Sequence, residues 1–194
     1  GKTIIITGAG GNFGREGCLY FARRGANIAA LDLNLNALDE TLIQVENAKC
    51  SGRIEAHLCD VANADYVEKT IQTVSNNFGR IDMLWNNAGY QGEIKPTLEY
   101  DPADFARVMN INVTGMFHLL QSVAKRMAAQ GVIGVNSSTK SHPYSIVNTA
   151  SVAALRGTPA MVAYSSSKAA VLAMTVCTAK VCHLLLYQPL ELLS

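Results

Sequence analysis

The sequence lacks the features that mark several special classes of protein. Its five cysteines are odd in number, form no C-x-x-C pair and show no metal-ligand spacing with the four histidines, which argues against a disulfide framework or a structural metal. There is no run of basic residues and the formal net charge is +1, so we expect no nucleic-acid partner. The apolar runs fall short of the roughly 20 residues of a membrane span. The opening "GKTIIITGAGG" predicts a strand and a glycine turn rather than a signal peptide. We therefore expect a cytoplasmic protein, without a membrane segment, that binds small molecules.

Apolar stretches of strand length alternate with amphipathic stretches of helix length along the 194 residues. We predict strands at 3–7, 27–33, 53–61, 81–89 and 145–151, and helices at 12–24, 35–48, 63–78 and 102–129. Asp101 and Pro102 supply an N-cap and a first-turn proline for the last helix. Repeated β-α-β units with right-handed crossovers predict an α/β fold, a doubly wound parallel sheet of the Rossmann type. The length favours one dinucleotide-binding domain over residues 1–194.

One segment interrupts this alternation. Residues 131–144, "GVIGVNSSTKSHPY", are polar and longer than the usual connection of two to six residues between helix and strand. We interpret them as an atypical insertion that forms a surface loop.

The stretch "TGAGGNFG", residues 7–14, follows the first strand and opens the first helix. A pyrophosphate can bind there on free backbone N–H groups at the positive helix end. The common G-x-G-x-x-G pattern would place its third glycine at Phe13, so that pattern fails. A wider spacing joins Gly8, Asn12 and Gly14, with Asn12 in the middle glycine position. Asparagine is the non-glycine residue that best tolerates a left-handed backbone, so the turn can still form. Tight packing alone would also explain the glycines.

Two aspartates follow later strands. Asp32 ends the second strand, 18 residues beyond Gly14 (32 − 14), where a carboxylate can accept hydrogen bonds from ribose hydroxyls and repel a 2′-phosphate. This favours NAD over NADP. The alternative is a helix-capping acid, although Asn34 is also placed to cap. Asp60 is placed either to reach an adenine ring or to cap the next helix.

The stretch "YSSSK", Tyr164 to Lys168, has the composition of a proton-transfer device. A free tyrosine, with a pKa of about 10, is a poor base near neutrality. Lys168 lies four residues on, one helical turn away, where its ammonium favours the phenolate. Ser151, at the end of the fifth predicted strand, is placed to orient a substrate hydroxyl and stabilise an alkoxide. An ordinary helix start is the alternative for the tyrosine and lysine.

With "TGAGGNFG", Asp32, "CDV", "NNAG", "NINVTG", "IVNTAS" and "YSSSK", the chain resembles the short-chain dehydrogenase/reductase family from Gly1 to about Thr175. The resemblance implies that the catalytic residues are Asn112, Ser151, Tyr164 and Lys168, with Asn112 holding a water of a proton relay; a helix-surface amide is the alternative for Asn112. It also implies a set of cofactor-binding residues: Gly8, Asn12, Phe13, Gly14, Asp32, Asp60, Val61, Asn86, Ala88, Gly89, Tyr164 and Lys168. "NNAGYQG" and "DFARVMNINVTGMFH" look similar to NAD-dependent polyol dehydrogenases, xylitol dehydrogenase in particular. Tyr90 and Gln91 would then shape a polar pocket or only a loop.

After Thr175 the family pattern is lost, so the sheet is expected to be incomplete at its C-terminal edge and 176–194 to form a divergent tail. A retained intron and a shifted reading frame would explain both this tail and 131–144, and the spliced transcript tests that. The leading hypothesis is an NAD-dependent enzyme that interconverts a polyol or secondary alcohol and its ketone, and that forms a homo-oligomer if complete. The alternatives are an inactive family member that binds nucleotide or a partner protein, and an NADPH-dependent ketoacyl reductase, which Asp32 disfavours.

Overall fold

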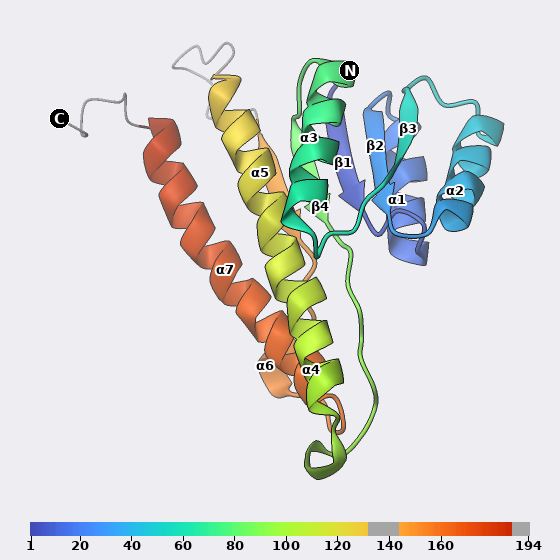
Figure 1. Ribbon diagram of the computed structural model, residues 1–194. Helices are drawn as coiled ribbons and strands as arrows, with labels where there is room; N and C mark the ends of the chain where they lie inside the picture. The colour runs from blue at the N-terminus through green and yellow to red at the C-terminus, as the bar shows by residue number, and fades with distance from the viewer. Residues whose placement is uncertain (132–143, 188–194) are drawn as a thin grey trace.

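A parallel five-stranded sheet organises the fold (Figure 1). The computed structural model describes residues 1–131 and 144–187, without the side chains of 181–187. The strands are β1 (Thr3–Thr7), β2 (Asn27–Asp32), β3 (Ile54–Leu58), β4 (Met83–Asn86) and β5 (Ser145–Asn148). Their order is β3-β2-β1-β4-β5 and every pair is parallel. This confirms the doubly wound fold, with the strand order reversing between β1 and β4, where such sheets bind ligands.

Helices cover both faces of this sheet. The described helices are α1 (Asn12–Ala22), α2 (Leu35–Asn47), α3 (Ala64–Phe78), η1 (Thr97–Glu99), α4 (Pro102–Met109), η2 (Asn110–Gly115), α5 (Met116–Ala129), α6 (Ala153–Arg156) and α7 (Val162–Tyr187). In Figure 1, α1 and α2 lie on one side of the strands, and α3 and α5 lie on the other. Within the described residues, no helix combines the length and the apolar character that crossing a membrane requires.

Two hydrophobic clusters lie on opposite faces of the sheet. Ile5 of β1 belongs to the cluster with α3 and α5, whereas its neighbours Ile4 and Ile6 belong to the cluster with α1 and α2. Successive side chains of a strand point to opposite faces, so both faces of β1 are covered. All five residues of β1 are buried, which explains its continuous apolar sequence.

Side chains cap three of the first four α-helices. Asn34, Asn63 and Asp101 accept hydrogen bonds from backbone N–H groups at the starts of α2, α3 and α4. The predicted Asp101 cap with Pro102 behind it is therefore confirmed. Gly11, at the start of α1, provides no such side chain. The first N–H groups of α1 thus lack the side-chain acceptor that the other three helices have.

The predicted elements differ from the observed ones mainly at the carboxyl ends of strands. The strands expected at 53–61, 81–89 and 145–151 end at Leu58, Asn86 and Asn148. The chain leaves the sheet at these points and forms the loops that line its edge. The helix expected at 102–129 is continuous but contains a π-helical segment, η2, at Asn110–Gly115.

The two atypical segments lie largely outside the described residues. Of 131–144, only the first and last residues are described, and 188–194 at the end of the tail are not. The first part of the tail continues α7 as far as Tyr187. Among the described strands, β5 stands at one edge of the sheet, as expected for a sheet that is incomplete there.

Candidate active site

The candidate residues gather at the carboxyl ends of β1, β4 and β5. Gly8 follows β1, the segment Asn87–Gly89 follows β4, and Ser151 lies three residues after the end of β5. The carboxyl ends of parallel strands meet at one edge of a sheet. Helix α7 and the π segment η2 bring the other candidates to this edge, because α7 packs against both α4 and η2.

Asn112 lies in the π segment and is fully buried. Its Oδ1 accepts a hydrogen bond from the Tyr90 N–H at 2.7 Å, and its Nδ2 donates to the Tyr90 carbonyl at 2.8 Å. Nδ2 also donates to Ser167 Oγ on α7 at 3.0 Å. The alternative that Asn112 is a helix-surface amide is therefore wrong. A π turn inside an α-helix is rare and often marks a functional position.

Lys168 is also buried, with 3 % of its surface exposed. Its Nζ donates to the Thr149 carbonyl at 2.7 Å and lies 5.7 Å from the centre of the Tyr164 ring. Burial lowers the pKa of Lys168 from its ordinary value, because a low-dielectric environment disfavours the cation. Tyr164 and Lys168 lie on the same side of α7, as their spacing predicts.

Gly89 lies beside both of these polar groups. A Cβ atom at Gly89 would be 3.3 Å from Asn112 Oδ1 and 3.6 Å from Lys168 Nζ. The loop after β4 therefore approaches the candidate proton-transfer groups through a residue without a side chain.

Ser151 is half-buried in the loop between β5 and α6 rather than in the strand itself. Its Oγ accepts a hydrogen bond from the Ala153 N–H at 3.2 Å. This bond uses one lone pair of the hydroxyl, so its proton can be donated to a substrate oxygen.

The glycine turn uses a different residue from the expected one for its left-handed backbone. Gly8 has φ +65°, and its carbonyl accepts a hydrogen bond from the Gly11 N–H at 3.1 Å. Asn12 is instead the first residue of α1 and has no positive φ, so this position does not require the left-handed backbone that the sequence analysis considered for it. Phe13 is 78 % exposed, next in the first turn of this uncapped helix.

Asp32 joins the glycine turn to the start of α2. Its Oδ2 accepts from the Gly10 N–H at 2.9 Å, and its Oδ1 accepts from the Asn34 N–H at 2.9 Å. Asn34 is the residue that caps α2, by accepting from the Ala37 N–H at 3.2 Å. The alternative that Asp32 serves as that cap is therefore wrong.

Asp60 and Val61 follow β3. Asp60 Oδ1 accepts from the Ala62 N–H at 2.9 Å, whereas α3 is capped by Asn63, so Asp60 is not its cap. The Val61 carbonyl lies 3.1 Å from His118 Nδ1 on α5. A Cβ at Gly115, the last residue of η2, would be 2.8 Å from Val61 Cγ2. This loop therefore lies directly against the end of the π segment.

Two threonines that the sequence reasoning did not single out connect the strands at the site. Thr7 Oγ1 accepts from the N–H groups of Asn87 and Ala88 at 2.8 and 2.9 Å. Thr149 Oγ1 accepts from Trp85 Nε1 at 3.0 Å and donates to Asn87 Oδ1 at 3.2 Å. Both threonines, like Ser167, lie inside motifs quoted in the sequence analysis. Their place in those motifs was the only sign in the sequence that they belong to the site.

Asn86 has a different position from its neighbours in "NNAG". It is 1 % exposed, and its Nδ2 donates to the Met116 carbonyl at 2.8 Å. Its side chain thus joins β4 to α5 beneath the site, while Ala88 and Gly89 are the residues nearer the surface.

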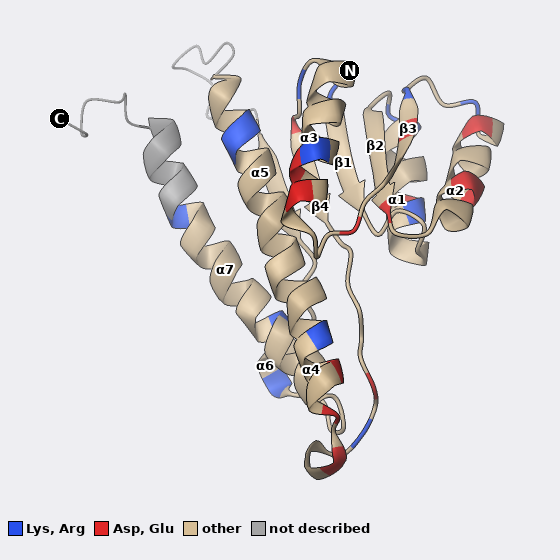
Figure 2. Cartoon of the chain, in the orientation of Figure 1, with Lys and Arg blue, Asp and Glu red and all other residues tan. Residues whose placement is uncertain are grey.

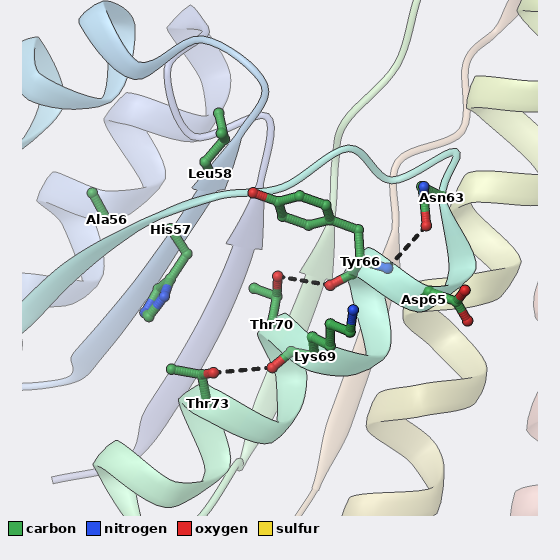
Figure 3. Close-up of a pocket in the computed structure, with 9 residues that line it drawn as sticks. All are labelled: Ala56, His57, Leu58, Asn63, Asp65, Tyr66, Lys69, Thr70 and Thr73. Atoms are coloured by element: carbon green, nitrogen blue, oxygen red, sulfur yellow. Dashed lines mark hydrogen bonds between the residues drawn. The ribbon is translucent and has the colours of Figure 1, made fainter.

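The hollow in Figure 3 lies away from these residues, between β3 and α3, and has a volume of about 620 Å³. Thr70 and Thr73 in its lining donate to carbonyls of their own helix, at Tyr66 and Lys69. The hollow shares no lining residue with the candidate active site.

Comparisons with known proteins decide the family. The family described as "short chain dehydrogenase" matches residues 2–183. The chain belongs to this family. The short-chain dehydrogenase match extends eight residues past Thr175 (183 − 175), so the resemblance continues further into α7 than the motifs indicate.

Several characterised short-chain dehydrogenases are similar to the chain. It is 32 % identical to the 3-oxoacyl-[acyl-carrier-protein] reductase FabG of Thermotoga maritima over 93 % of this chain and 68 % of that protein. It is 34 % identical to the D-threitol dehydrogenase of Mycolicibacterium smegmatis over 87 % of this chain and 59 % of that protein. Among solved structures, the crystal structure of NAD⁺-bound xylitol dehydrogenase superposes with a TM-score of 0.84 and 40 % sequence identity. The match covers 95 % of this chain and 66 % of the xylitol dehydrogenase chain. The chain thus spans about two thirds or less of these relatives.

Proposed function

We propose that the chain is an NAD-dependent oxidoreductase that interconverts an alcohol and its ketone. The observation that carries this proposal is the placement of buried Lys168 beside Tyr164, with buried Asn112 and half-buried Ser151 at the same edge of the sheet. A phenol becomes a usable base when a cation stabilises its phenolate.

The residues present fit a dinucleotide. The start of α1 has no side-chain cap, so the N–H groups of Asn12, Phe13 and Gly14 are the ones that would hold a pyrophosphate. Asp32 retains lone pairs for ribose hydroxyls, and its charge disfavours a 2′-phosphate. When bound, NAD supplies the hydride acceptor.

Arg15 does not offset this preference for NAD. Its guanidinium donates to Glu40 Oε2 at 2.8 Å, to the Gly10 carbonyl at 2.9 Å and to Thr41 Oγ1 at 3.1 Å. A 2′-phosphate would have to compete with these partners for the cation. Residues 33–36, "LNLN", add no basic side chain, which supports NAD and disfavours the ketoacyl reductase alternative with NADPH.

Each candidate side chain has a defined role in this proposal. Lys168 stabilises the phenolate of Tyr164, which accepts the proton of the substrate hydroxyl and becomes a neutral phenol; Lys168 also anchors a ribose. Ser151 donates to the substrate oxygen as negative charge develops there. Asn112 orders the water that links Lys168 to solvent. Asp60, Val61, Ala88 and Gly89 line the nucleotide, and Asn86 supports that wall from below.

The substrate class that we favour is a polyol. The supporting observation is the similarity to xylitol dehydrogenase and D-threitol dehydrogenase, both of which are named for polyols. FabG is named for an acyl substrate, so a matched screen of polyols and a 3-oxoacyl thioester discriminates between the two classes. NADH formation with a polyol is the expected result, and NADPH consumption with the thioester alone would contradict it.

Replacing Tyr164 with phenylalanine tests the catalytic assignment. Tyr164→Phe removes the phenolic oxygen and leaves Asp32 and the glycine turn intact. We expect substrate-dependent NADH formation to be lost while NAD binding is nearly unchanged. Turnover equal to that of the unaltered protein would refute the role of Tyr164.

The second candidate function is nucleotide or partner binding without catalysis. It is favoured by the length of the chain, which spans 59 % to 68 % of the three relatives described above. NAD binding without turnover on any substrate of the screen would support it. NADH formation with an alcohol would exclude it.

The proposed setting is a cytoplasmic homo-oligomer. Cys18 and Cys59 are buried free thiols, as expected in a reducing compartment. Between Val162 and Lys180, where its side chains are described, α7 carries only Lys168 and Lys180 as charged residues (Figure 2), and its exposed Ala173, Val176 and Cys177 recur at helical spacing. An exposed apolar helix face favours association with a second copy, and sedimentation equilibrium distinguishes a monomer from a dimer or tetramer.

A further inference from the structure

The carboxylate of Asp104 accepts three hydrogen bonds from the loop that connects β4 to α4. Its Oδ1 accepts from Tyr90 Oη at 3.0 Å, and its Oδ2 accepts from the Glu93 N–H at 2.9 Å and from Tyr100 Oη at 2.7 Å. Asp104 lies in the first turn of α4, but Asp101 is the residue that caps this helix. The three bonds of Asp104 therefore serve the loop rather than the helix end.

The loop is packed tightly onto α4 around this carboxylate. Gly92 has φ +76°, and a Cβ there would be 2.5 Å from Tyr100 Oη and 2.9 Å from Asp104 Oδ2. On the next turn of α4, the Arg107 guanidinium lies 4.6 Å from the centre of the Tyr90 ring, within the range of a cation–π contact. The side chain of Tyr90 is thus directed onto α4.

The same tyrosine holds Asn112 through its backbone. The Tyr90 N–H and carbonyl form both of the hydrogen bonds that join this loop to the Asn112 amide. Asp104 and Asn112 are eight residues apart (112 − 104), one on α4 and the other in the π segment. Tyr90 therefore connects them, by its hydroxyl at one end and its peptide groups at the other.

Asp104 is negatively charged, which strengthens the hydrogen bonds that join it to Tyr90 and the loop. The Glu93 N–H and then the Tyr100 hydroxyl, which donate to the carboxylate, lower the pKa of Asp104 from its ordinary value. Asp104 is thus ionised near neutrality, and hydrogen bonds to an ionised acceptor are shorter and stronger than neutral ones.

We propose that Asp104 is a positioning residue for the reaction: it fixes the loop from Tyr90 to Glu93 on α4, and Tyr90 in turn fixes the amide of Asn112 opposite Ser167. This inference rests on the proposed function for its effect on turnover. The contacts themselves do not depend on it.

Removal of the carboxylate should lower turnover without weakening the nucleotide half. For Asp104→Ala we expect kcat to fall about 10- to 100-fold, because small displacements of positioned groups are costly. KM for NAD should stay within about twofold, since no contact at Asp32 or the glycine turn changes. Tyr90→Phe removes a single hydrogen bond, so its kcat should fall about 2- to 10-fold.

Asp101→Ala is the matched control. It removes a neighbouring carboxylate that caps α4 and accepts from the Ala103 N–H rather than from Tyr90, Glu93 or Tyr100, so it should lower the unfolding midpoint and leave kcat unchanged. An Asp104→Ala variant with unchanged kcat, or with kcat reduced no more than in Asp101→Ala, would overturn the proposal.

Hydrogen exchange provides a second measurement that does not need turnover. The Tyr90 amide, which donates to Asn112, should exchange faster in Asp104→Ala and in Tyr90→Phe than in the unaltered chain. If the unaltered chain forms no NADH with any substrate, the proposed function fails. The exchange measurement still decides whether Asp104 fixes Tyr90 and, through it, the amide of Asn112. Unchanged exchange at Tyr90 in both variants would refute the inference.

Discussion

Alanine at Gly8 is expected to damage both the fold and the nucleotide site, and Gly79 offers a matched control. Both glycines have a left-handed backbone, with φ +65° at Gly8 and +74° at Gly79. A left-handed backbone costs an L-residue with a Cβ about 1–2 kcal/mol. A Cβ at Gly79 would meet nothing within 4 Å, whereas one at Gly8 would be 3.1 Å from Ala88 Cα and 3.2 Å from Ala88 N.

The contacts at Gly8 add a packing cost to the conformational one. The backbone of Ala88 must shift to admit the methyl group, and overpacking of this kind costs about 1–3 kcal/mol. The free energy of unfolding should therefore fall by about 1–2 kcal/mol in Gly79→Ala and by about 2–5 kcal/mol in Gly8→Ala. For a chain of this size, each kcal/mol lowers Tm by about 2–4 °C.

Thermal unfolding with and without NAD separates the two effects. NAD at 100 times its Kd should stabilise the unaltered chain and Gly79→Ala by about 2.7 kcal/mol, a rise in Tm of about 5–11 °C. A tenfold loss of affinity in Gly8→Ala would reduce that stabilisation to about 1.4 kcal/mol. Equal losses of stability and equal NAD shifts in the two variants would refute the reasoning.

Three further predictions concern other parts of the structure. Valine at Gly17 should displace the ring of Trp85, because a Cβ there would overlap the ring at Cζ3, and the emission of this single tryptophan should shift; an unchanged spectrum would contradict the packing. Exposed Cys177 should react with a maleimide in the native state, whereas Cys18, whose pKa burial raises to about 12, should react only on unfolding, as peptide mapping would show. The lowered pKa of Asp104 contributes stability that is present above its ordinary value of 3.8 and is lost as the pH falls through the folded value. The difference in Tm between the unaltered chain and Asp104→Asn should therefore be constant near neutrality and shrink below pH 3.8; a difference that is the same at all pH values would exclude this linkage.

The sequence was sufficient for the fold because its signals are local. Buried parallel strands read as continuous apolar runs, and β1 is buried along its whole length. Caps such as Asp101 depend on residues one turn away. The spacing from Tyr164 to Lys168 likewise places both side chains on one side of a helix.

The features that sequence reasoning missed arise from contacts between distant residues. The helical pattern of 102–129 predicts one α-helix, but the amide of Asn112 bonds Tyr90, 22 residues earlier, and Ser167, 55 residues later. No local periodicity encodes such partners. The role of Asp104 depends in the same way on Gly92, whose turn brings the loop onto α4.

The most direct test of the account is NADH formation by the purified chain with a set of polyols, measured beside Tyr164→Phe at saturating NAD. The account predicts that at least one polyol yields NADH with the unaltered chain and none with the variant, although both bind NAD. No NADH from the unaltered chain with NAD demonstrably bound, or equal NADH from both proteins, would contradict it.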